Sequence, residues 1–166
     1  MKLFDVYPLY DVNPTKAKNV FVYDKDGKEY LDLYGGHAVI SIGHSHPDYI
    51  KNISSQLNKI GFYSNSVINP LQKELANSIE SLSGCYNYRL FICNSGAESN
   101  ENALKLASMH TGKKRVIAFK NSFHGRTSAA IAATDFRSFH SPLDQQQKVT
   151  FISLNDIYAL ENELKI

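Results

Sequence analysis

Two short turns in the sequence carry residue types that can bind charged groups. The first is Asn-Ser-Gly-Ala at 94–97, which joins an apolar run at 88–93 directly to a helical pattern. Small residues such as Gly96 and Ala97 let an anion approach the unpaired backbone N–H groups of a helix N-terminus, where the helix dipole adds partial positive charge. This turn therefore suits a phosphate group.

The second turn places an aromatic ring, an imidazole and a guanidinium within four residues, Phe-His-Gly-Arg at 123–126. Phe123 offers a face on which a planar ring can stack. Arg126 can hold a carboxylate through two parallel hydrogen bonds. Together these types suit a flat ligand or substrate that carries an acid group.

Each turn also has a purely structural interpretation. Ser95 followed three residues later by Glu98 is a capping box, an ordinary way to begin a helix. Phe123 can be a core aromatic, and Arg126 can form a surface ion pair. The first turn lacks the lysine of GxxxxGK[ST] loops and the three glycines of the dinucleotide fingerprint, so neither nucleotide motif is present.

The elements around the turns predict that they meet. Apolar runs at 88–93, 115–119 and 149–153 are typical of short strands, and helical patterns at 96–110 and 157–164 alternate with them. This alternation indicates an α/β fold with a mostly parallel sheet. Turns that follow parallel strands lie at the same sheet edge, so with right-handed crossovers and neighbouring strands both turns face one cleft.

The first half of the chain is organised differently. Residues 20–33 predict two strands around Asp26-Gly27, a hairpin signal. Apolar residues recur at helical spacing after Pro47 and again after Pro70, where Asn69 is the expected cap, and proline suits the first turn of a helix.

His44 and His46 form a His-x-His pair, which is one way to begin a metal site. A catalytic zinc normally takes a third protein ligand, and no residue with ligand spacing lies nearby in the sequence. We therefore expect no metal.

The bulk composition excludes several classes of function. The 166 residues include 18 basic and 16 acidic ones, which gives a net charge of +2, and the basic residues form no concentrated face for nucleic acid or an anionic membrane. Cys85 and Cys93 are too few for a disulfide framework, and no run has the length of a transmembrane helix or the pattern of a signal peptide. We expect a cytoplasmic protein.

Three stretches resemble the acetylornithine aminotransferases, which belong to the class III pyridoxal-phosphate transaminases of fold type I. They are YLDLYGGHAVISIGHSHP, FICNSGAESNENALKLA and VIAFKNSFHGRT, and they cover most of residues 20–135 in the family's order. The resemblance implies a small-domain segment at 1–50 and the first part of the large cofactor-binding domain at 51–166.

The resemblance also implies roles for individual residues. Gly96 and Ala97 would hold the phosphate of pyridoxal 5'-phosphate through backbone amides, with Ser95 as a helper. Phe123 would stack on the pyridine ring, with His124 shaping the pocket beside it. Arg126 would bind the α-carboxylate of an N-acylornithine.

The implied reaction passes the terminal amino group of N2-acetylornithine, or another N-acylornithine, to 2-oxoglutarate in arginine biosynthesis. Family members are homodimers, and the loop 61–70, with Tyr63, Ser64 and Asn65, is a candidate for substrate or cross-subunit contact. Ornithine and 4-aminobutyrate are alternative amino donors within the same family.

The family's Schiff-base lysine and the aspartate that faces the pyridine nitrogen have no counterpart in these 166 residues. Lys120 stands at a predicted strand end rather than in the matching context. We therefore expect the chain to be the N-terminal portion of a transaminase, with no catalytic lysine of its own and no turnover alone. A non-catalytic anion-binding module is the alternative from another functional class.

Overall fold

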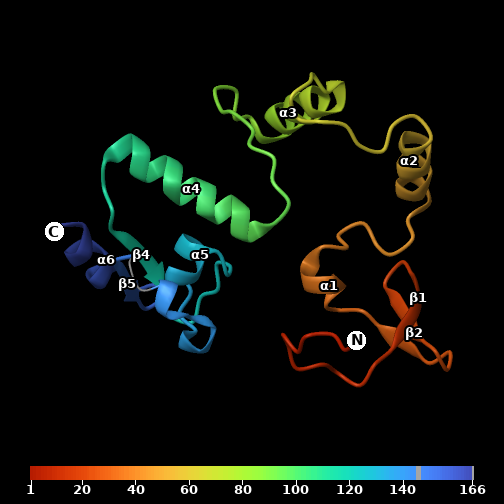
Figure 1. Cartoon of the computed structure of the whole chain (residues 1–166), viewed down its shortest axis with the longest axis horizontal. Coiled ribbons are helices and arrows are strands. Elements are labelled where there is room, and N and C mark those ends of the chain that lie inside the picture. Colours follow the sequence, from red (N-terminus) through yellow and green to blue (C-terminus); the bar gives the residue numbers. More distant parts are fainter. Residues whose placement is uncertain (145–146, 166) are drawn as a thin grey trace. The chain divides into compact units, whose positions relative to one another are not determined.

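The computed structural model describes residues 1–144 and 147–165, and its contacts group the chain into two compact units, Met1–Pro70 and Leu71–Ile166 (Figure 1). Units within one chain differ from the domains of a family, so the small-domain segment predicted for residues 1–50 stays a prediction. Among the described residues, no helix combines the length and apolar character needed to cross a membrane.

The first unit contains a three-stranded antiparallel sheet in the order β1-β2-β3, with β1 at Pro14–Lys18, β2 at Phe21–Asp24 and β3 at Glu29–Leu31. The predicted hairpin is therefore confirmed as β2 and β3. Its turn is held by the Asp24 carboxylate, which accepts the N–H groups of Asp26 and Lys28 at 2.9 Å each. Strand β1 was not predicted, because the polar sequence PTKAK lacks the alternating apolar pattern of a half-buried strand.

The Gly- and His-rich connector of the first unit forms a turn of left-handed backbone, α1 at Gly35–Ala38, where all four residues have φ between 56° and 60°. Asp32 anchors this turn, because its carboxylate accepts the N–H groups of Tyr34 and Gly35. The same carboxylate lies 2.7 Å from Nε2 of His44. The hydrogen bond with His44, followed by that from Gly35, holds the pKa of Asp32 below its ordinary value.

Both proline-initiated helices form where the sequence predicts them. Helix α2 spans Pro47–Leu57, and α3 spans Pro70–Ser83. Their predicted apolar faces are exposed, including Tyr49, Ile50, Ile53 and Leu57 on α2 and Leu71, Leu75, Ile79 and Leu82 on α3.

The second unit is built around two parallel strands, β4 at Val116–Phe119 and β5 at Val149–Ile152, paired in register from Val116 with Val149 to Phe119 with Ile152. The remaining elements of this unit are α4 (Gly96–Thr111), α5 (Ser128–Ala132), two short 3-10 turns, η1 (Arg137–Phe139) and η2 (Pro142–Asp144), and α6 (Ile157–Leu164). Helix α5 contacts both α4 and η2, and α6 contacts β5. The parallel strands and their helices confirm the predicted α/β class.

Small side chains make the buried core of this unit. Its hydrophobic members are Ala118, Ala130, Ile131, Ala132, Ala133 and Ile152. Helix α5 supplies half of them, Ala130, Ile131 and Ala132, so the stretch SAAIAA that follows the Phe-His-Gly-Arg turn is largely buried. The residues with the lowest exposure, Ala130, Ile131 and Thr134, therefore follow this turn closely in the sequence.

The predicted strand at 88–93 is wrong for this structure, because residues 88–93 are not assigned to any strand. A strand needs a neighbour to take up its backbone hydrogen bonds. Among the described residues no strand pairs with this segment, and the side chains of Leu90, Phe91 and Ile92 are exposed. An apolar run has the composition of a strand but does not supply the partner.

Candidate functional site

The first turn begins helix α4 with the predicted capping box. The Ser95 hydroxyl accepts the N–H of Glu98 at 3.2 Å and donates to the Glu98 carboxylate at 2.9 Å. Glu98 also accepts the N–H of Asn94 at 3.0 Å. The hydrogen bonds from the Ser95 hydroxyl and the Asn94 side chain hold the pKa of Glu98 below its ordinary value, so the cap carries a negative charge at neutral pH.

The capping box leaves two backbone donors unused. The N–H groups of Gly96 and Ala97 make no hydrogen bond to any residue that the structure describes. A Cβ placed on Gly96 would meet no atom within 4 Å, so the space beside this residue is open. Both donors point from the first turn of a 16-residue helix, whose dipole favours an anion there.

The second turn touches the first. Gly125 is buried, and a Cβ at this position would lie 2.6 Å from the Cβ of Ala97 and 2.8 Å from its Cα. Gly125 also has φ of +132°, a backbone conformation that side chains rarely adopt. Glycine is thus required here both for space and for backbone shape, and it brings the turns into contact.

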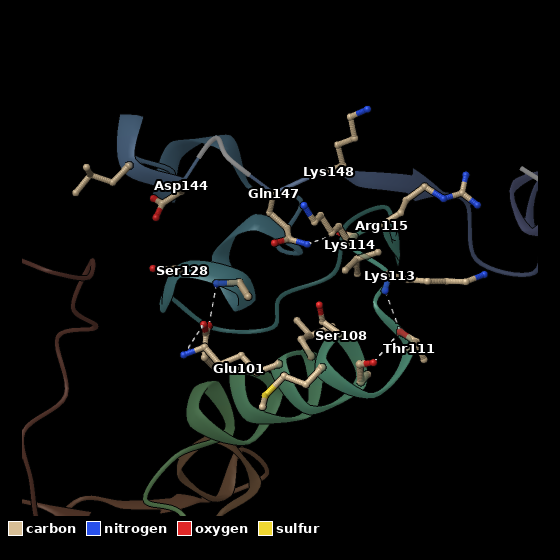
Figure 2. A pocket seen from close by; sticks show the side chains of 17 residues that line it. Glu101, Ser108, Thr111, Lys113, Lys114, Arg115, Ser128, Asp144, Gln147 and Lys148 are labelled. Atoms are coloured by element: carbon tan, nitrogen blue, oxygen red, sulfur yellow. Dashed lines mark hydrogen bonds and ion pairs between the residues drawn. The ribbon is translucent and has the colours of Figure 1, made fainter.

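Hydrogen bonds from α4 fix the backbone of the second turn. The Asn100 side-chain amide donates to the carbonyl oxygen of His124 at 2.8 Å. One oxygen of Glu101 accepts the Thr127 hydroxyl at 2.8 Å, the N–H of Ala129 at 2.8 Å and the N–H of Ala130 at 3.2 Å. Glu101, a residue of α4, therefore caps the N-terminus of α5. Figure 2 shows its carboxylate next to the start of α5.

The segment after α5 holds the turn from its other side. Thr134 is fully buried, and its hydroxyl accepts the N–H of His124 at 2.9 Å. The Asp135 carboxylate accepts the N–H of Asn121 at 2.8 Å, where the backbone has a left-handed φ of 58°. The loop 121–127 is therefore clamped between α4 and residues 134–135.

The predicted side chains of the second turn lie at the surface of this clamp. The Phe123 ring is 54% exposed and packs edge-on against Phe139, with 6.1 Å between ring centroids. His124 is half-buried, and its Nε2 lies 3.1 Å from the Ser122 hydroxyl. Arg126 is exposed, between buried Gly125 and half-buried Thr127. The structure thus brings together the backbones of Gly96, Ala97 and the second turn, and Phe123 and Arg126 are exposed residues of that turn.

Sequence reasoning missed Asn100, Glu101, Thr134 and Asp135. The first two are polar residues inside a helix, where charge is ordinarily a sign of a solvated face. Their side chains form hydrogen bonds to residues 24 to 29 positions away in the sequence, which no local pattern reveals. The sequence of α5 does carry a signal for such a partner. This short helix has no acidic residue in its own first turn, so an acceptor for its N-terminal N–H groups has to come from another segment.

A separate cavity of about 880 Å³ lies behind Glu101, between α4 and the segments that contain η2 and the start of β4. Figure 2 shows its rim of Lys113, Lys114, Arg115 and Lys148. Arg115 is paired with Glu163 at 3.0 Å. None of the residues predicted to bind cofactor or substrate lines this cavity.

The two histidines of the His-x-His pair have different surroundings. His44 binds Asp32, and Nδ1 of His46 is buried without a hydrogen-bond partner among the described residues. Within residues 1–144 and 147–165, no group of three or more His, Cys, Asp or Glu side chains is arranged to hold a metal ion.

Comparison with known proteins decides the family. The sequence profile described as "Aminotransferase class-III" matches residues 5–165. The chain belongs to the class III aminotransferases. Pyridoxal phosphate is the cofactor of this family. The helix start at Gly96–Ala97 has two backbone donors that suit its phosphate, and the turn that contacts Ala97 carries an exposed aromatic residue that suits its ring.

Curated relatives of this class III chain include two acetylornithine aminotransferases. That of Bacillus amyloliquefaciens is 43% identical over 132 residues, which are 80% of this chain and 57% of the relative. That of Bacillus cereus is 41% identical over 162 residues, which are 96% of this chain and 41% of the relative. The chain thus spans less than two thirds of either protein.

Solved structures give the same fold. A Toxoplasma gondii ornithine aminotransferase superposes with a TM-score of 0.88 at 26% identity, over 98% of this chain and 40% of that one. Another structure of the Toxoplasma gondii ornithine aminotransferase has partial occupancy of PLP at its active site. It superposes with a TM-score of 0.85 at 26% identity, over 96% of this chain and 40% of that one. The class III chain therefore has the fold type I architecture.

Proposed function

We propose that the protein is an N-acylornithine aminotransferase, which moves the terminal amino group of N2-acetylornithine to 2-oxoglutarate in arginine biosynthesis. The observation that carries this proposal is the contact between Gly125 and Ala97, because it joins a phosphate-type helix start to a turn with an aromatic ring and a guanidinium. Similarity to the two acetylornithine aminotransferases supports the choice of amino donor.

Different residues of the chain bind the phosphate and the pyridine ring of the cofactor. The N–H groups of Gly96 and Ala97 donate to the cofactor phosphate, with the α4 dipole adding to their attraction. The exposed face of Phe123 stacks on the pyridine ring, and half-buried His124 limits the pocket beside it. When bound, the cofactor supplies the electron sink for amino-group transfer, while the protein supplies binding and orientation.

Ser95 is a weaker candidate for contact with the phosphate than its neighbours. Its hydroxyl already accepts from the Glu98 N–H and donates to the Glu98 carboxylate. To donate to a phosphate, the hydroxyl must rotate away from Glu98. We propose that Ser95 acts first as the helix cap and that its role toward the phosphate is secondary.

Arg126 is proposed to bind the α-carboxylate of the amino donor. Arg126 is an exposed residue directly after Gly125, so the proposed carboxylate site lies one residue from the contact with the phosphate turn. A guanidinium fixes both the position and the angle of a carboxylate, which orients the remote amino group of the same molecule.

The remaining catalytic groups are proposed to lie outside residues 1–166. Lys120 is exposed at the end of β4, and its backbone N–H bonds the carbonyl oxygen of Ile152. We do not assign it the role of the family's cofactor-binding lysine. Residues 1–166 alone are accordingly expected to show no turnover in a transaminase assay, and measurable turnover by them would contradict this part of the proposal.

The amino donor is tested by kinetics on the protein expressed from its complete gene. N2-acetylornithine, N2-succinylornithine, ornithine and 4-aminobutyrate are compared as donors to 2-oxoglutarate by kcat/KM. An acylated ornithine is expected to give the highest value. A higher value for unacylated ornithine would favour the ornithine aminotransferase alternative, which the similarity to the Toxoplasma gondii structure supports.

We also propose a cytoplasmic homodimer, with the loop 61–70 at the substrate or the subunit contact. Tyr63 in this loop is exposed, and the Ser64 hydroxyl accepts the N–H of Ser66 at 3.1 Å. Light scattering on the complete protein measures the oligomeric state. A monomer at concentrations where the enzyme is active would overturn the dimer.

A further inference from the structure

Glu101 binds the second turn more extensively than a helix-surface carboxylate ordinarily binds its surroundings. One of its oxygens accepts three hydrogen bonds, from the Thr127 hydroxyl and from the N–H groups of Ala129 and Ala130. Its other oxygen lies 3.7 Å from the ammonium of Lys105, one turn further along α4. The Glu101 side chain is only 12% exposed, whereas that of Lys105 is 66% exposed.

These contacts divide into a strong set and a weak set. The three hydrogen bonds are charge-assisted and half-buried, so each is stronger than a bond between neutral groups. The pair with Lys105 is open to solvent, where ion pairs contribute little. Burial by itself raises the pKa of Glu101, but the hydrogen bonds from Thr127, Ala130 and Ala129 and the charge of Lys105 hold it below its ordinary value. The carboxylate is therefore ionised at neutral pH.

Arg126 lies between two residues that contact α4. Thr127, which follows Arg126, donates a hydrogen bond to Glu101. Gly125, which precedes Arg126, packs closely against Ala97. Both backbone neighbours of Arg126 are thus fixed to α4, one by a hydrogen bond through Thr127 and the other by close packing. These two contacts therefore restrict the backbone from which the Arg126 side chain leaves.

We propose that Glu101 is a positioning residue for the carboxylate site, which it aims by fixing Thr127 and the start of α5. This inference rests on the proposed role of Arg126 as the anchor of the donor carboxylate. Glu101 touches neither substrate nor cofactor in this proposal. It acts through Thr127 on the angle of the guanidinium, and a misplaced anchor weakens binding of the acid group.

The experiment compares substitutions in the cofactor-loaded protein from the complete gene. Glu101→Ala removes all three bonds. Glu101→Gln retains an oxygen that can accept them, and Lys105→Ala removes only the exposed ion pair. Arg126→Ala tests the anchor itself. The readouts are KM and kcat for N2-acetylornithine and the dissociation constant of glutarate, measured by calorimetry, because glutarate has two carboxylates and no amino group to react.

The expected result is selective. Glu101→Ala raises KM and the glutarate dissociation constant about tenfold, the order expected for losing charge-assisted hydrogen bonds at an anchor, and changes kcat less. Lys105→Ala stays within about twofold of the parent protein, as expected for losing an exposed ion pair. Glu101→Gln keeps the acceptor oxygen but loses the charge assistance of the three bonds, so its KM and glutarate dissociation constant lie between those of Lys105→Ala and Glu101→Ala. Pyridoxal phosphate content, measured by absorbance, stays unchanged in all three.

The outcomes separate this inference from the proposed function. If Arg126→Ala binds glutarate as the parent protein does, or if the parent protein does not bind it, the carboxylate anchor is wrong and the role of Glu101 is overturned with it. If Arg126→Ala weakens binding but Glu101→Ala does not, only the positioning role is overturned. A loss of cofactor in Glu101→Ala would show a general structural role and overturn it too.

A second variant keeps the test decisive if Glu101→Ala fails to fold. Thr127→Val removes the hydroxyl that donates to Glu101 and leaves the carboxylate and both amide bonds in place. Its glutarate dissociation constant is expected to rise several-fold, as for one charge-assisted hydrogen bond, while Thr127→Ser, which retains the hydroxyl, is expected to match the parent protein. Equal affinity in Thr127→Val and Thr127→Ser would overturn the proposal.

Discussion

Gly125 and Ala97 are in contact so close that a side chain at position 125 would overlap Ala97, with 2.6 Å between the two Cβ atoms. The residues belong to different turns and are 28 positions apart, and each turn carries one half of the proposed ligand chemistry. The geometry of the site therefore depends on the absence of a single methyl group.

Gly125→Ala is expected to push the turns apart and to destabilise the protein more than an ordinary glycine substitution. Gly112→Ala is the matched control, because Gly112 also has a positive φ, of 70°, but a Cβ there would meet no atom within 4 Å. The control is expected to lower the free energy of unfolding by about 1–2 kcal/mol from backbone strain. Gly125→Ala adds about 1–3 kcal/mol for overlap. Urea unfolding measures both, and equal losses would contradict the steric argument.

Ser95→Ala tests the helix cap below the proposed phosphate site. The substitution removes the acceptor for the Glu98 N–H, so we expect the free energy of unfolding to fall by about 1 kcal/mol. Ser99→Ala is the control, because Ser99 is an exposed serine on the same helix. A loss of stability no larger in Ser95→Ala than in the control would mean that the capping box contributes nothing measurable.

Thr134→Val tests the clamp behind the second turn. Valine has nearly the shape of threonine but cannot accept the His124 N–H, which would then be left without its partner. The expected loss is about 1–3 kcal/mol, the cost of an unsatisfied buried donor. Thr134→Ser retains the hydroxyl and should lose less. Hydrogen exchange at the His124 amide provides an independent reading, since it should speed up only in Thr134→Val.

Acid is expected to lower the stability of the protein by protonating the hydrogen-bonded carboxylates of Glu98 and Glu101 on α4. Hydrogen bonds lower the pKa of Glu98 and outweigh burial to lower that of Glu101, so both contribute stability that is fully present above the ordinary glutamate value of 4.5. That contribution is lost as pH falls below 4.5 through the lower folded-state values. Thermal unfolding midpoints measured from neutral pH downward should fall less steeply in Glu98→Gln and Glu101→Gln. Parallel curves for the parent and both variants would rule out this linkage.

The helices and the two turns follow from local sequence signals. Pro47 and Pro70 begin helices where predicted, and Ser95 caps α4 through Glu98. Gly112 ends α4 in a left-handed conformation, as glycine commonly does. Each of these signals acts within a few residues, which is why the sequence alone reveals it.

The failures are residues whose conformation or contacts depend on other segments of the chain. The run 88–93 has strand composition, but among the described residues it has no neighbouring strand. Strand β1 pairs with β2, its neighbour in the chain, but its polar sequence has no apolar alternation to indicate a strand. In the sequence, Glu101 has the pattern of a solvent-exposed helix residue. Only the fold shows that α5 lies next to it and donates hydrogen bonds to its carboxylate. In each case the deciding interaction joins segments that periodicity cannot relate.

The hydrogen bonds that join α4 to the second turn link residues only 24 to 29 positions apart. Closing a chain segment of this length costs little entropy compared with pairing across a whole domain, and contacts local in sequence favour fast folding. We therefore expect residues 96–134 to assemble early in folding. Pulse-labelled hydrogen exchange during refolding should show the Ala129 and Ala130 amides among the first to be protected. The proposed phosphate site at Gly96 and Ala97 would then be formed, and able to bind the cofactor, before the rest of the polypeptide has folded.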